Sequence, residues 1–284
     1  MQKCLSYCGN HNMLKSAYFN RKDYMKKAAF FDVDGTILDH HNYIPKSTVD
    51  GIHKIQANGC YAFLCTGRSR AFVKNKELLD IGFDGIISGC GTMIEFQEQV
   101  LYYKKIEQEQ IKKTLAFLKD QKAAVIMEGR HKLYLDPEDF GSDLYIAKLR
   151  EEVGSGMMPI TGSEADWEVS KFSCAIERAD LNRLRAGLED EYSLLVHDIP
   201  IMEVVPKGCS KGTGILKVCD QLGIRAEDTY AFGDSVNDLP MFEVAGYSIA
   251  MGNANDKVKQ KAAYVTDALH DDGIYHALEH FGLF

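Results

Sequence analysis

Two carboxylates, one residue apart, follow an apolar run near the start of the chain. Residues 28–31 are Ala-Ala-Phe-Phe, and Asp32 and Asp34 come directly after them. An apolar run with almost no alternation is typical of a strand buried on both faces of a parallel α/β sheet. Such sheets bind ligands beyond the carboxyl ends of their strands. We therefore expect both acids at a crevice, with their side chains on one side of the strand and Val33 on the other.

The two acids predict a cation site. Like charges held this close repel each other and raise one pKa unless a cation neutralises them. Oxygen ligands suit Mg²⁺, which usually takes one or two protein carboxylates. Asp-x-Asp-Gly also occurs in calcium loops and in ordinary turns. The calcium alternative is weaker, because residues 36–44 lack the acidic pattern and the closing Glu of such a loop.

A second polar cluster follows the apolar run at 61–65. The hydroxyl of Thr66 and the amide of Gly67 could hold a phosphoryl oxygen, because a helix is predicted to follow at about residues 69–80. Thr-Gly after a strand is also an ordinary turn.

Two more clusters lie in the last third of the chain. Lys207 and Lys211 stand near the start of a helix predicted to end at residue 222, where positive charge opposes the helix dipole and suggests a bound anion. A solvated lysine is the ordinary alternative. The apolar run at 229–232 is followed by Gly-Asp-Ser-Val-Asn-Asp, in which a helix N-cap could explain one acid but hardly all of them. All the clusters fall at strand ends or adjoining helix starts, so parallel strand order would bring them to one crevice.

These residues carry a resemblance to the haloacid dehalogenase (HAD) superfamily, in particular its Cof-type phosphatases (subclass IIB) with a large α/β cap. The four motifs that resemble it are Asp32-Val-Asp-Gly-Thr, Thr66-Gly-Arg, Lys211-Gly and Gly233-Asp-Ser-Val-Asn-Asp238, and the resemblance covers about residues 27–281. One position departs from the pattern: Cys90-Gly91 stands where similar proteins usually have Asn before Gly.

The resemblance implies a role for each motif. Asp32 would attack phosphorus and carry an aspartyl-phosphate, while Asp34 would act as general acid and base. Mg²⁺ would be held by the carboxylates of Asp32 and Asp234 and the backbone carbonyl of Asp34. Asp238 would support Lys211 or the metal waters. The residues that would contact the phosphoryl group are Val33, Thr66, Gly67, Lys211 and Asn237.

The order of predicted elements indicates a doubly wound, Rossmann-like α/β core with an inserted α+β cap. Residues 27–91 and 206–284 alternate strand and helix. Residues 92–205 begin with a hairpin and mix strands and helices, which suggests a second domain; its single Trp167 is expected in the core. Residues 1–26 lack the apolar segment of a secretory signal, and we expect a dispensable leader with Met25 as the natural start.

Composition narrows the possible partners. The net charge of −8 argues against a general binder of nucleic acid or anionic membranes, and no apolar run approaches the roughly 18 residues of a membrane span. Scattered cysteines without paired spacing predict free thiols and a cytoplasmic location. A small phosphorylated metabolite is the expected partner.

The expected function is a Mg²⁺-dependent phosphatase acting on small phosphorylated metabolites, with sugar phosphates favoured. A phosphomutase of the phosphomannomutase type and a non-catalytic phosphate-binding module remain as alternatives. The particular substrate and the oligomeric state are left open, and specificity is expected to reside in the cap and near Cys90.

Overall fold

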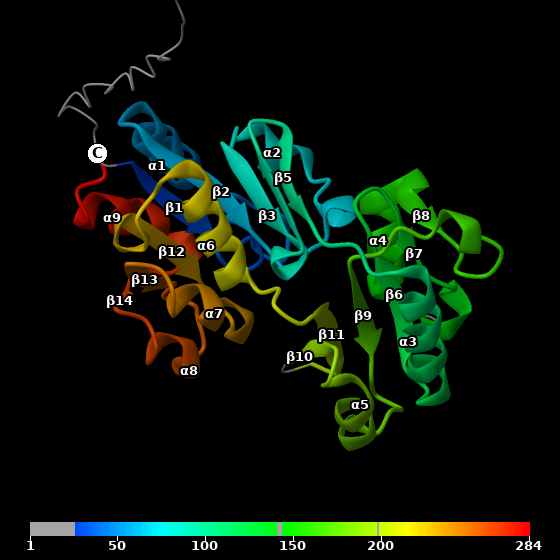
Figure 1. Cartoon of the computed structure of the whole chain (residues 1–284). Helices are drawn as coiled ribbons and strands as arrows, with labels where there is room; N and C mark the ends of the chain where they lie inside the picture. The colour runs from blue at the N-terminus through cyan, green and yellow to red at the C-terminus, as the bar shows by residue number, and fades with distance from the viewer. Residues whose placement is uncertain (1–25, 141–143, 198) are drawn as a thin grey trace, which may run out of the picture.

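The computed structural model describes residues 26–140, 144–197 and 199–284 (Figure 1). The expected leader, apart from its last residue, lies outside the described residues, as do Cys4 and Cys8.

The larger of two sheets has eight strands in the order β14-β13-β12-β1-β2-β3-β4-β5. Every pair from β14 to β3 is parallel. The chain starts at the centre of the sheet, builds β2 and β3 on one side and later returns to build β12 on the other. The crevice between β1 and β12 is therefore the topological switch point, where such sheets bind ligands. The parallel strands are β1 (Lys27–Phe31), β2 (Cys60–Cys65), β3 (Gly85–Ser88), β12 (Thr229–Gly233), β13 (Tyr247–Ala250) and β14 (Tyr264–Val265).

Helices cover both faces of this sheet. The apolar cluster on one face includes residues of α1 (Lys46–Ala57) and α9 (Gly273–His280). The cluster on the other face includes residues of α6 (Lys211–Leu222), α7 (Leu239–Phe242) and α8 (Asp256–Lys259). This arrangement confirms the predicted doubly wound α/β core.

One local prediction was wrong. The helix expected over residues 69–80 is a 3-10 turn at Arg70–Phe72 followed by α2 (Lys76–Asp80). The side chain of Asn75 caps α2 by accepting from the amide of Leu78, so the helix restarts there.

The predicted hairpin forms, but it belongs to the larger sheet. Strands β4 (Met93–Phe96) and β5 (Gln99–Tyr103) pair antiparallel and extend the sheet beyond β3. The division of the chain at residue 92 was expected to place this hairpin in the inserted domain, whereas its backbone hydrogen bonds join it to the core sheet.

The second sheet has six strands in the order β10-β11-β9-β6-β7-β8, and Figure 1 shows it beside the core with α3 and α5 on its outer side. Its core contains the buried Trp167, as predicted. We call residues 104–206 the cap, since they hold this sheet and its helices. The cap elements are α3 (Gln108–Asp120), β6 (Ala124–Glu128), β7 (Leu133–Tyr134), α4 (Leu144–Val153), β8 (Met157–Met158), β9 (Lys171–Ala175), α5 (Leu181–Leu188), β10 (Tyr192–Val196) and β11 (Ile201–Pro206).

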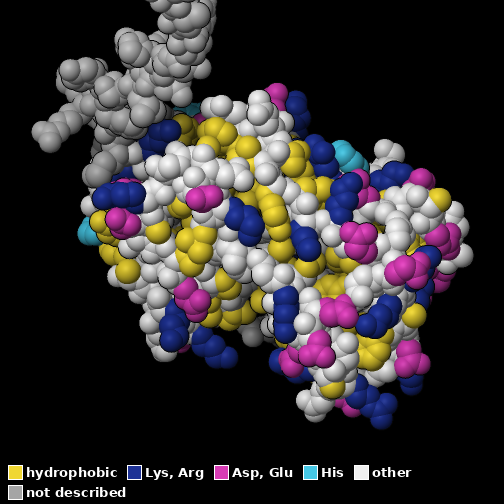
Figure 2. Space-filling view, viewed as in Figure 1, with side chains coloured by type: hydrophobic (Ala, Val, Ile, Leu, Met, Phe, Trp, Pro, Cys, Tyr) yellow, Lys and Arg dark blue, Asp and Glu magenta, His cyan; other side chains and the backbone are white. Residues whose placement is uncertain are grey.

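The described part of the chain carries mixed surface charge and free cysteines. On the face drawn in Figure 2, acidic and basic side chains are interspersed. All six cysteines within the described ranges are free. No helix in the described part of the chain combines the length and apolar character required to cross a membrane.

Candidate active site

The carboxyl ends of β1 and β12 bring three acids together. Asp32 follows β1 and Asp234 follows β12, and these two strands are hydrogen-bonded neighbours. Carboxylate oxygens of Asp32, Asp234 and Asp238 all lie within 4.8 Å of one another. The convergence expected from the sequence is therefore present at the switch point of the sheet.

Lys211 is the cation that faces these acids. Its ammonium lies 2.6 Å from Asp32 Oδ1 and 2.5 Å from Asp238 Oδ1, and its side chain is fully buried. Burial lowers the pKa of Lys211, but the carboxylates of Asp238 and Asp32 outweigh this and raise it well above its usual value. Lys207, the other lysine considered from the sequence, is exposed in the turn before α6.

Asp238 holds the loop that follows β12. Its second carboxylate oxygen accepts the backbone amides of Asp234 and Ser235 at 2.9 and 3.0 Å. Asn237 Oδ1 accepts from Lys211 Nζ at 3.3 Å and from the hydroxyl of Ser235. The loop after β12 is thus tied to the lysine at several points.

A tight turn brings the loop after β1 against Asp234. Gly35 has φ +83°, and a Cβ at this position would overlap the carboxylate of Asp234, so only glycine fits without strain. The hydroxyl of Thr36 donates to Asp234 Oδ1 at 3.1 Å, and Asn253 Nδ2 donates to the carbonyl of Gly35 at 2.7 Å. These contacts fix the orientation of Asp234.

The charges of the cluster suit a cation. Burial, followed by the charge of Asp238, raises the pKa of Asp32 well above its usual value and that of Asp234 to about 7. The single positive charge of Lys211 does not neutralise the three nearby carboxylates. Because Asp238 is already bonded to Lys211 and two amides, Asp32 and Asp234 are the carboxylates that could ligate a metal, and oxygen donors of this kind suit Mg²⁺.

Asp34 lies apart from the three acids. Its carboxylate accepts two hydrogen bonds from the guanidinium of Arg68, at 2.8 and 2.6 Å, and its side chain is 59% exposed. Strand β1 ends at Phe31, so strand alternation does not position Asp32 and Asp34 as expected from the sequence. Both acids nevertheless line the same cavity.

The Thr66 loop forms another wall of the cavity. Thr66 is buried, and its hydroxyl accepts the amide of Arg68 at 3.1 Å. Gly67 lies beside Asn237, since a Cβ at Gly67 would be 3.5 Å from Asn237 Nδ2. The side chain of Val33 is buried in the core, so only its backbone could reach a ligand there.

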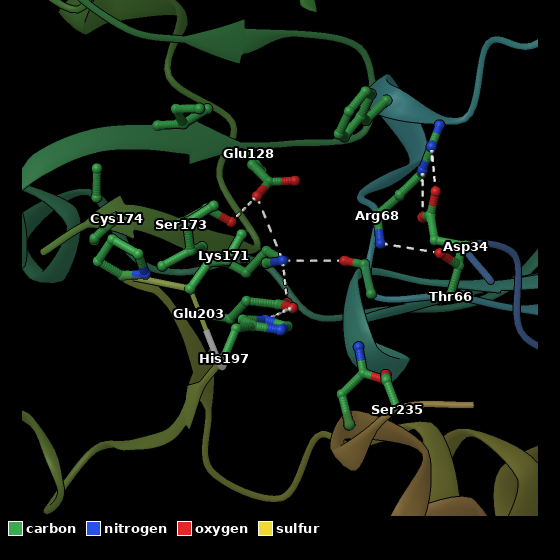
Figure 3. A pocket seen from close by; sticks show the side chains of 18 of the residues that line it. Asp34, Thr66, Arg68, Glu128, Lys171, Ser173, Cys174, His197, Glu203 and Ser235 are labelled. Carbon is green, nitrogen blue, oxygen red and sulfur yellow. Dashed lines mark hydrogen bonds and ion pairs between the residues drawn. The ribbon is translucent and has the colours of Figure 1, made fainter. Parts of the chain in front are cut away.

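The cavity has a volume of about 550 Å³ and runs between the core and the cap. Figure 3 shows the labelled cap side chains on one side of it and those of the core on the other. The cap contributes a polar cluster that the sequence analysis did not identify. We call this the cap cluster; its members are Glu128, Lys171, Ser173, His197 and Glu203.

Lys171 is the centre of the cap cluster. Its ammonium lies 2.5 Å from Glu203 Oε2 and 3.4 Å from Glu128 Oε1, and it donates to the carbonyl of Gly67 at 3.0 Å (Figure 3). Burial lowers the pKa of Lys171, but the charges of Glu128 and Glu203 raise it overall. The hydrogen bond from Lys171 to the carbonyl of Gly67 joins the cap to the loop at Thr66 and Gly67, which the sequence predicts to bind phosphate.

Cys90 stands beside this cluster in an unusual backbone conformation. Its φ of 53° and ψ of 42° lie in the left-handed region, where Asn is favoured among non-glycine residues. This preference gives a physical reason for the Asn expected there. The thiol donates to Glu203 Oε2 at 3.2 Å, and burial, followed by the charge of Glu203, raises its pKa well above its usual value.

Comparison with known proteins gives consistent results. A family model described as haloacid dehalogenase-like hydrolase matches residues 29–278. A Bacillus subtilis protein, YkrA, whose name describes it as a phosphatase, is 33% identical over 90% of this chain and 98% of its own length. A second B. subtilis relative, named 5-amino-6-(5-phospho-D-ribitylamino)uracil phosphatase YwtE, is 27% identical over 89% of this chain and 97% of its own length.

A solved structure shares the fold at full length. The HAD subclass IIB sugar phosphatase BT4131 superposes with a TM-score of 0.79 at 29% identity, covering 91% of this chain and 100% of that protein. The four motifs, the capped α/β core and these matches lead to one assignment. The chain belongs to the haloacid dehalogenase-like hydrolases, as a phosphatase of the Cof-type, subclass IIB branch.

Proposed function

We propose that this protein is a Mg²⁺-dependent phosphatase that hydrolyses small phosphorylated metabolites through an aspartyl-phosphate on Asp32. One observation supports this more than any other: Asp32, Lys211 and Asp234 come from three separate segments and meet at the switch point of the sheet.

Asp32 is the nucleophile in this proposal. One of its oxygens attacks phosphorus, the bond to the leaving oxygen breaks, and water later attacks the acyl phosphate to release inorganic phosphate. Lys211 favours the ionised form of Asp32, since its ammonium lies 2.6 Å away. The ammonium of Lys211 also donates to Asn237 and Asp238, and in this proposal it exchanges its contact with Asn237 for a phosphoryl oxygen. Asn237, Thr66 and the backbone of Val33 and Gly67 would contact the phosphoryl group with it.

Asp34 acts as the general acid and base. It gives a proton to the leaving oxygen in the first half-reaction and takes one from the attacking water in the second. Its carboxylate now bonds to Arg68, so it must leave at least one of these bonds to reach the substrate. The pair holds Asp34 at the edge of the cavity until a substrate arrives.

Asp32, Asp234 and the backbone carbonyl of Asp34 would hold Mg²⁺. When bound, the ion screens the nucleophile from the phosphate and stabilises charge in the transition state. Asp238 supports this arrangement indirectly, because it fixes both Lys211 and the loop that carries Asp234.

Substrates would be phosphomonoesters of small metabolites, with sugar phosphates first among them. The cavity is large enough for a sugar beside the phosphate. Among the relatives named above, BT4131 is described as a sugar phosphatase and YwtE as a 5-amino-6-(5-phospho-D-ribitylamino)uracil phosphatase. We also propose that residues 27–91 and 206–284 carry the reactive groups and that residues 92–205 are the segment inserted between them, although its first hairpin joins the core sheet. A cytoplasmic location is proposed from the free cysteines in the described ranges.

A screen of phosphorylated metabolites with added Mg²⁺ tests the proposal, with p-nitrophenyl phosphate as the general substrate. Asp32→Asn should lower kcat on the order of 10³-fold or more, because the nucleophile is lost. Asp80→Asn, a change of an exposed acid in α2, should leave kcat unchanged. Full turnover by Asp32→Asn would contradict the assignment, and a requirement for a sugar bisphosphate activator would favour a phosphomutase instead.

A further inference from the structure

We propose that the cap selects esters whose leaving alcohol carries no anionic group and offers hydroxyl or amino donors to the cap cluster. This inference rests on the proposed phosphatase function and concerns the part of the substrate beyond the phosphate.

The strand register places the cap cluster on one face of the cap sheet. Glu128 on β6 pairs with Lys171 on β9, and Ser173, two residues further along β9, pairs with Glu203 on β11. Side chains two residues apart on a strand share a face. The opposite face carries apolar residues that pack in the cap core with α3 and α5. The face that carries the cap cluster is therefore the one that lines the cavity, and the apolar Ile126, Ala175 and Ile201 lie on it as well.

Acids outnumber cations on the cap wall of the cavity. Among the described cap residues that line it, Glu128, Glu177 and Glu203 are acids, and Lys171 is the single lysine or arginine. His197 Nε2 lies 2.9 Å from Glu203 Oε1. A second phosphate or a carboxylate on the leaving alcohol would meet more negative than positive charge here, which is unfavourable at short range.

The lysine and arginine that line the cavity are already engaged. An ammonium has three donors, and Lys171 has three acceptors, on Gly67, Glu203 and Glu128. Arg68 makes its paired hydrogen bonds to Asp34 and lies 3.6 Å from Glu152. An anionic group on the leaving alcohol would therefore compete with Glu128 and Glu203 for Lys171. It would also compete with Glu152 for Arg68, even once Asp34 has turned to the substrate.

The same wall offers acceptors to a donor-rich alcohol. Glu203 Oε2 already accepts from Lys171 and Cys90, whereas Glu203 Oε1 faces His197 and Glu128 Oε2 accepts the amide of Ser69, so these two oxygens can each take a further hydrogen bond. The hydroxyl of Ser173 also has lone pairs while it donates to Glu128. Hydroxyl or amino groups of a sugar could use these oxygens without displacing Lys171. The wall thus favours polyols, sugars and amino sugars.

The test compares substrates of similar size and different charge. We choose glucose 6-phosphate, glucosamine 6-phosphate and 6-phosphogluconate, whose leaving alcohols are neutral, cationic and anionic. The wild-type enzyme should show a kcat/KM for the first two that is at least about tenfold higher than for the third. Affinity of the same three compounds for Asp32→Asn, measured by calorimetry, gives the selectivity without turnover.

Two variants connect the selectivity to the cap wall. Glu128→Gln removes a charge and keeps the side-chain shape, and it should reduce the preference for neutral over anionic substrate at least about threefold. Glu177→Gln changes an exposed acid at the rim and should act in the same direction if Glu128→Gln fails to fold. Glu109→Gln, a change on the outer helix α3, is the matched control and should leave the preference unchanged.

The outcomes separate this inference from the proposed function. Turnover of 6-phosphogluconate as fast as of glucose 6-phosphate would overturn the inference and leave the phosphatase function standing. Binding that favours the neutral and cationic esters, without hydrolysis of any ester, would support the selectivity and refute the phosphatase. If Asp32→Asn binds none of the three compounds, or if the variants keep the wild-type preference, the inference is wrong.

Discussion

Replacing Lys171 by methionine tests how strongly one buried cation stabilises the contact between cap and core. The side chain of Lys171 is 2% exposed and lies between the carboxylates of Glu128 and Glu203, which are 5% and 8% exposed. Methionine has a similar length but no charge. The substitution would therefore leave two buried acids without their cation and would remove the hydrogen bond to the carbonyl of Gly67.

The expected loss is large for a single substitution. Breaking a buried ion pair by removing one partner costs about 3–5 kcal/mol of unfolding free energy. At about 2–4 °C per kcal/mol for a chain of this size class, the midpoint of thermal unfolding should fall by at least about 6 °C. A surface pair contributes at most about 1 kcal/mol, so Lys113→Met, which breaks an exposed pair between α3 and Glu191, should shift the midpoint little.

Thermal and urea unfolding of the two variants measure this difference. Burial raises the pKa of Glu203, but the ammonium of Lys171, with His197, holds it well below its usual range. Glu203 therefore stabilises the native protein above the pKa of the unfolded chain, and this contribution is lost as pH falls. In Lys171→Met, the charged form of the buried Glu203 destabilises the folded protein, and protonation of Glu203 at lower pH removes this destabilisation. The gap between wild type and Lys171→Met should shrink from pH 7 to pH 5.

Two results would refute this reasoning about Lys171. One is a loss below about 1 kcal/mol, which would mean that the buried pair behaves like a surface pair. The other is a gap that stays constant or widens as the pH falls.

Three further predictions concern the core. Gly35→Ala should lower kcat/KM on the order of 10²-fold, because its Cβ would displace Asp234. Gly59→Ala, at a φ of +80° with open space around it, is the control and should only lower stability. Equal kinetics of the two variants would count against the contact. Cys90→Asn should keep or raise the free energy of unfolding by up to about 1 kcal/mol, and Cys90→Val should lower it, since Asn tolerates the left-handed region and a β-branched residue does not; urea unfolding decides this. Because the pKa of Asp234 is raised to about 7, Mg²⁺ must displace a proton, so its affinity in calorimetry should rise from pH 6 to pH 8; a pH-independent affinity would argue against Asp234 as a ligand.

The sequence predicted the core better than its connections. Continuous apolar runs identified β1, β2 and β12 nearly to the residue, because strands buried on both faces leave that pattern. The helix expected over residues 69–80 failed because Asn75 restarts the chain as a capped helix. The hairpin of β4 and β5 was recognised, but a local pattern does not tell which sheet a strand will join.

The core part of the site was predictable because its residues follow strands in short motifs. Parallel strand order alone brings Asp32 and Asp234 to one edge. The cap cluster was missed because its members are far apart in the sequence. A signal was present: Lys171 and Glu203 interrupt otherwise apolar strands, and a charge inside such a strand needs a partner. The position of the partner depends on the register of β9 with β11 and β6, which the sequence pattern did not give.

The path of the chain between the two sheets has a consequence for how such an enzyme can change over evolution. The chain leaves the core after the hairpin at Lys104, whose amide donates to the carbonyl of Thr92 at 2.7 Å. Gly91, next to Thr92, packs directly against the backbone of Ser210, where the chain returns from β11. Exit and return are thus neighbours, so a whole cap can be exchanged between homologues without re-routing the core. Mutations can then alter substrate preference on one sheet while the reactive groups on the other stay untouched, which makes this architecture a natural source of new specificities and a practical scaffold for cap-swap engineering.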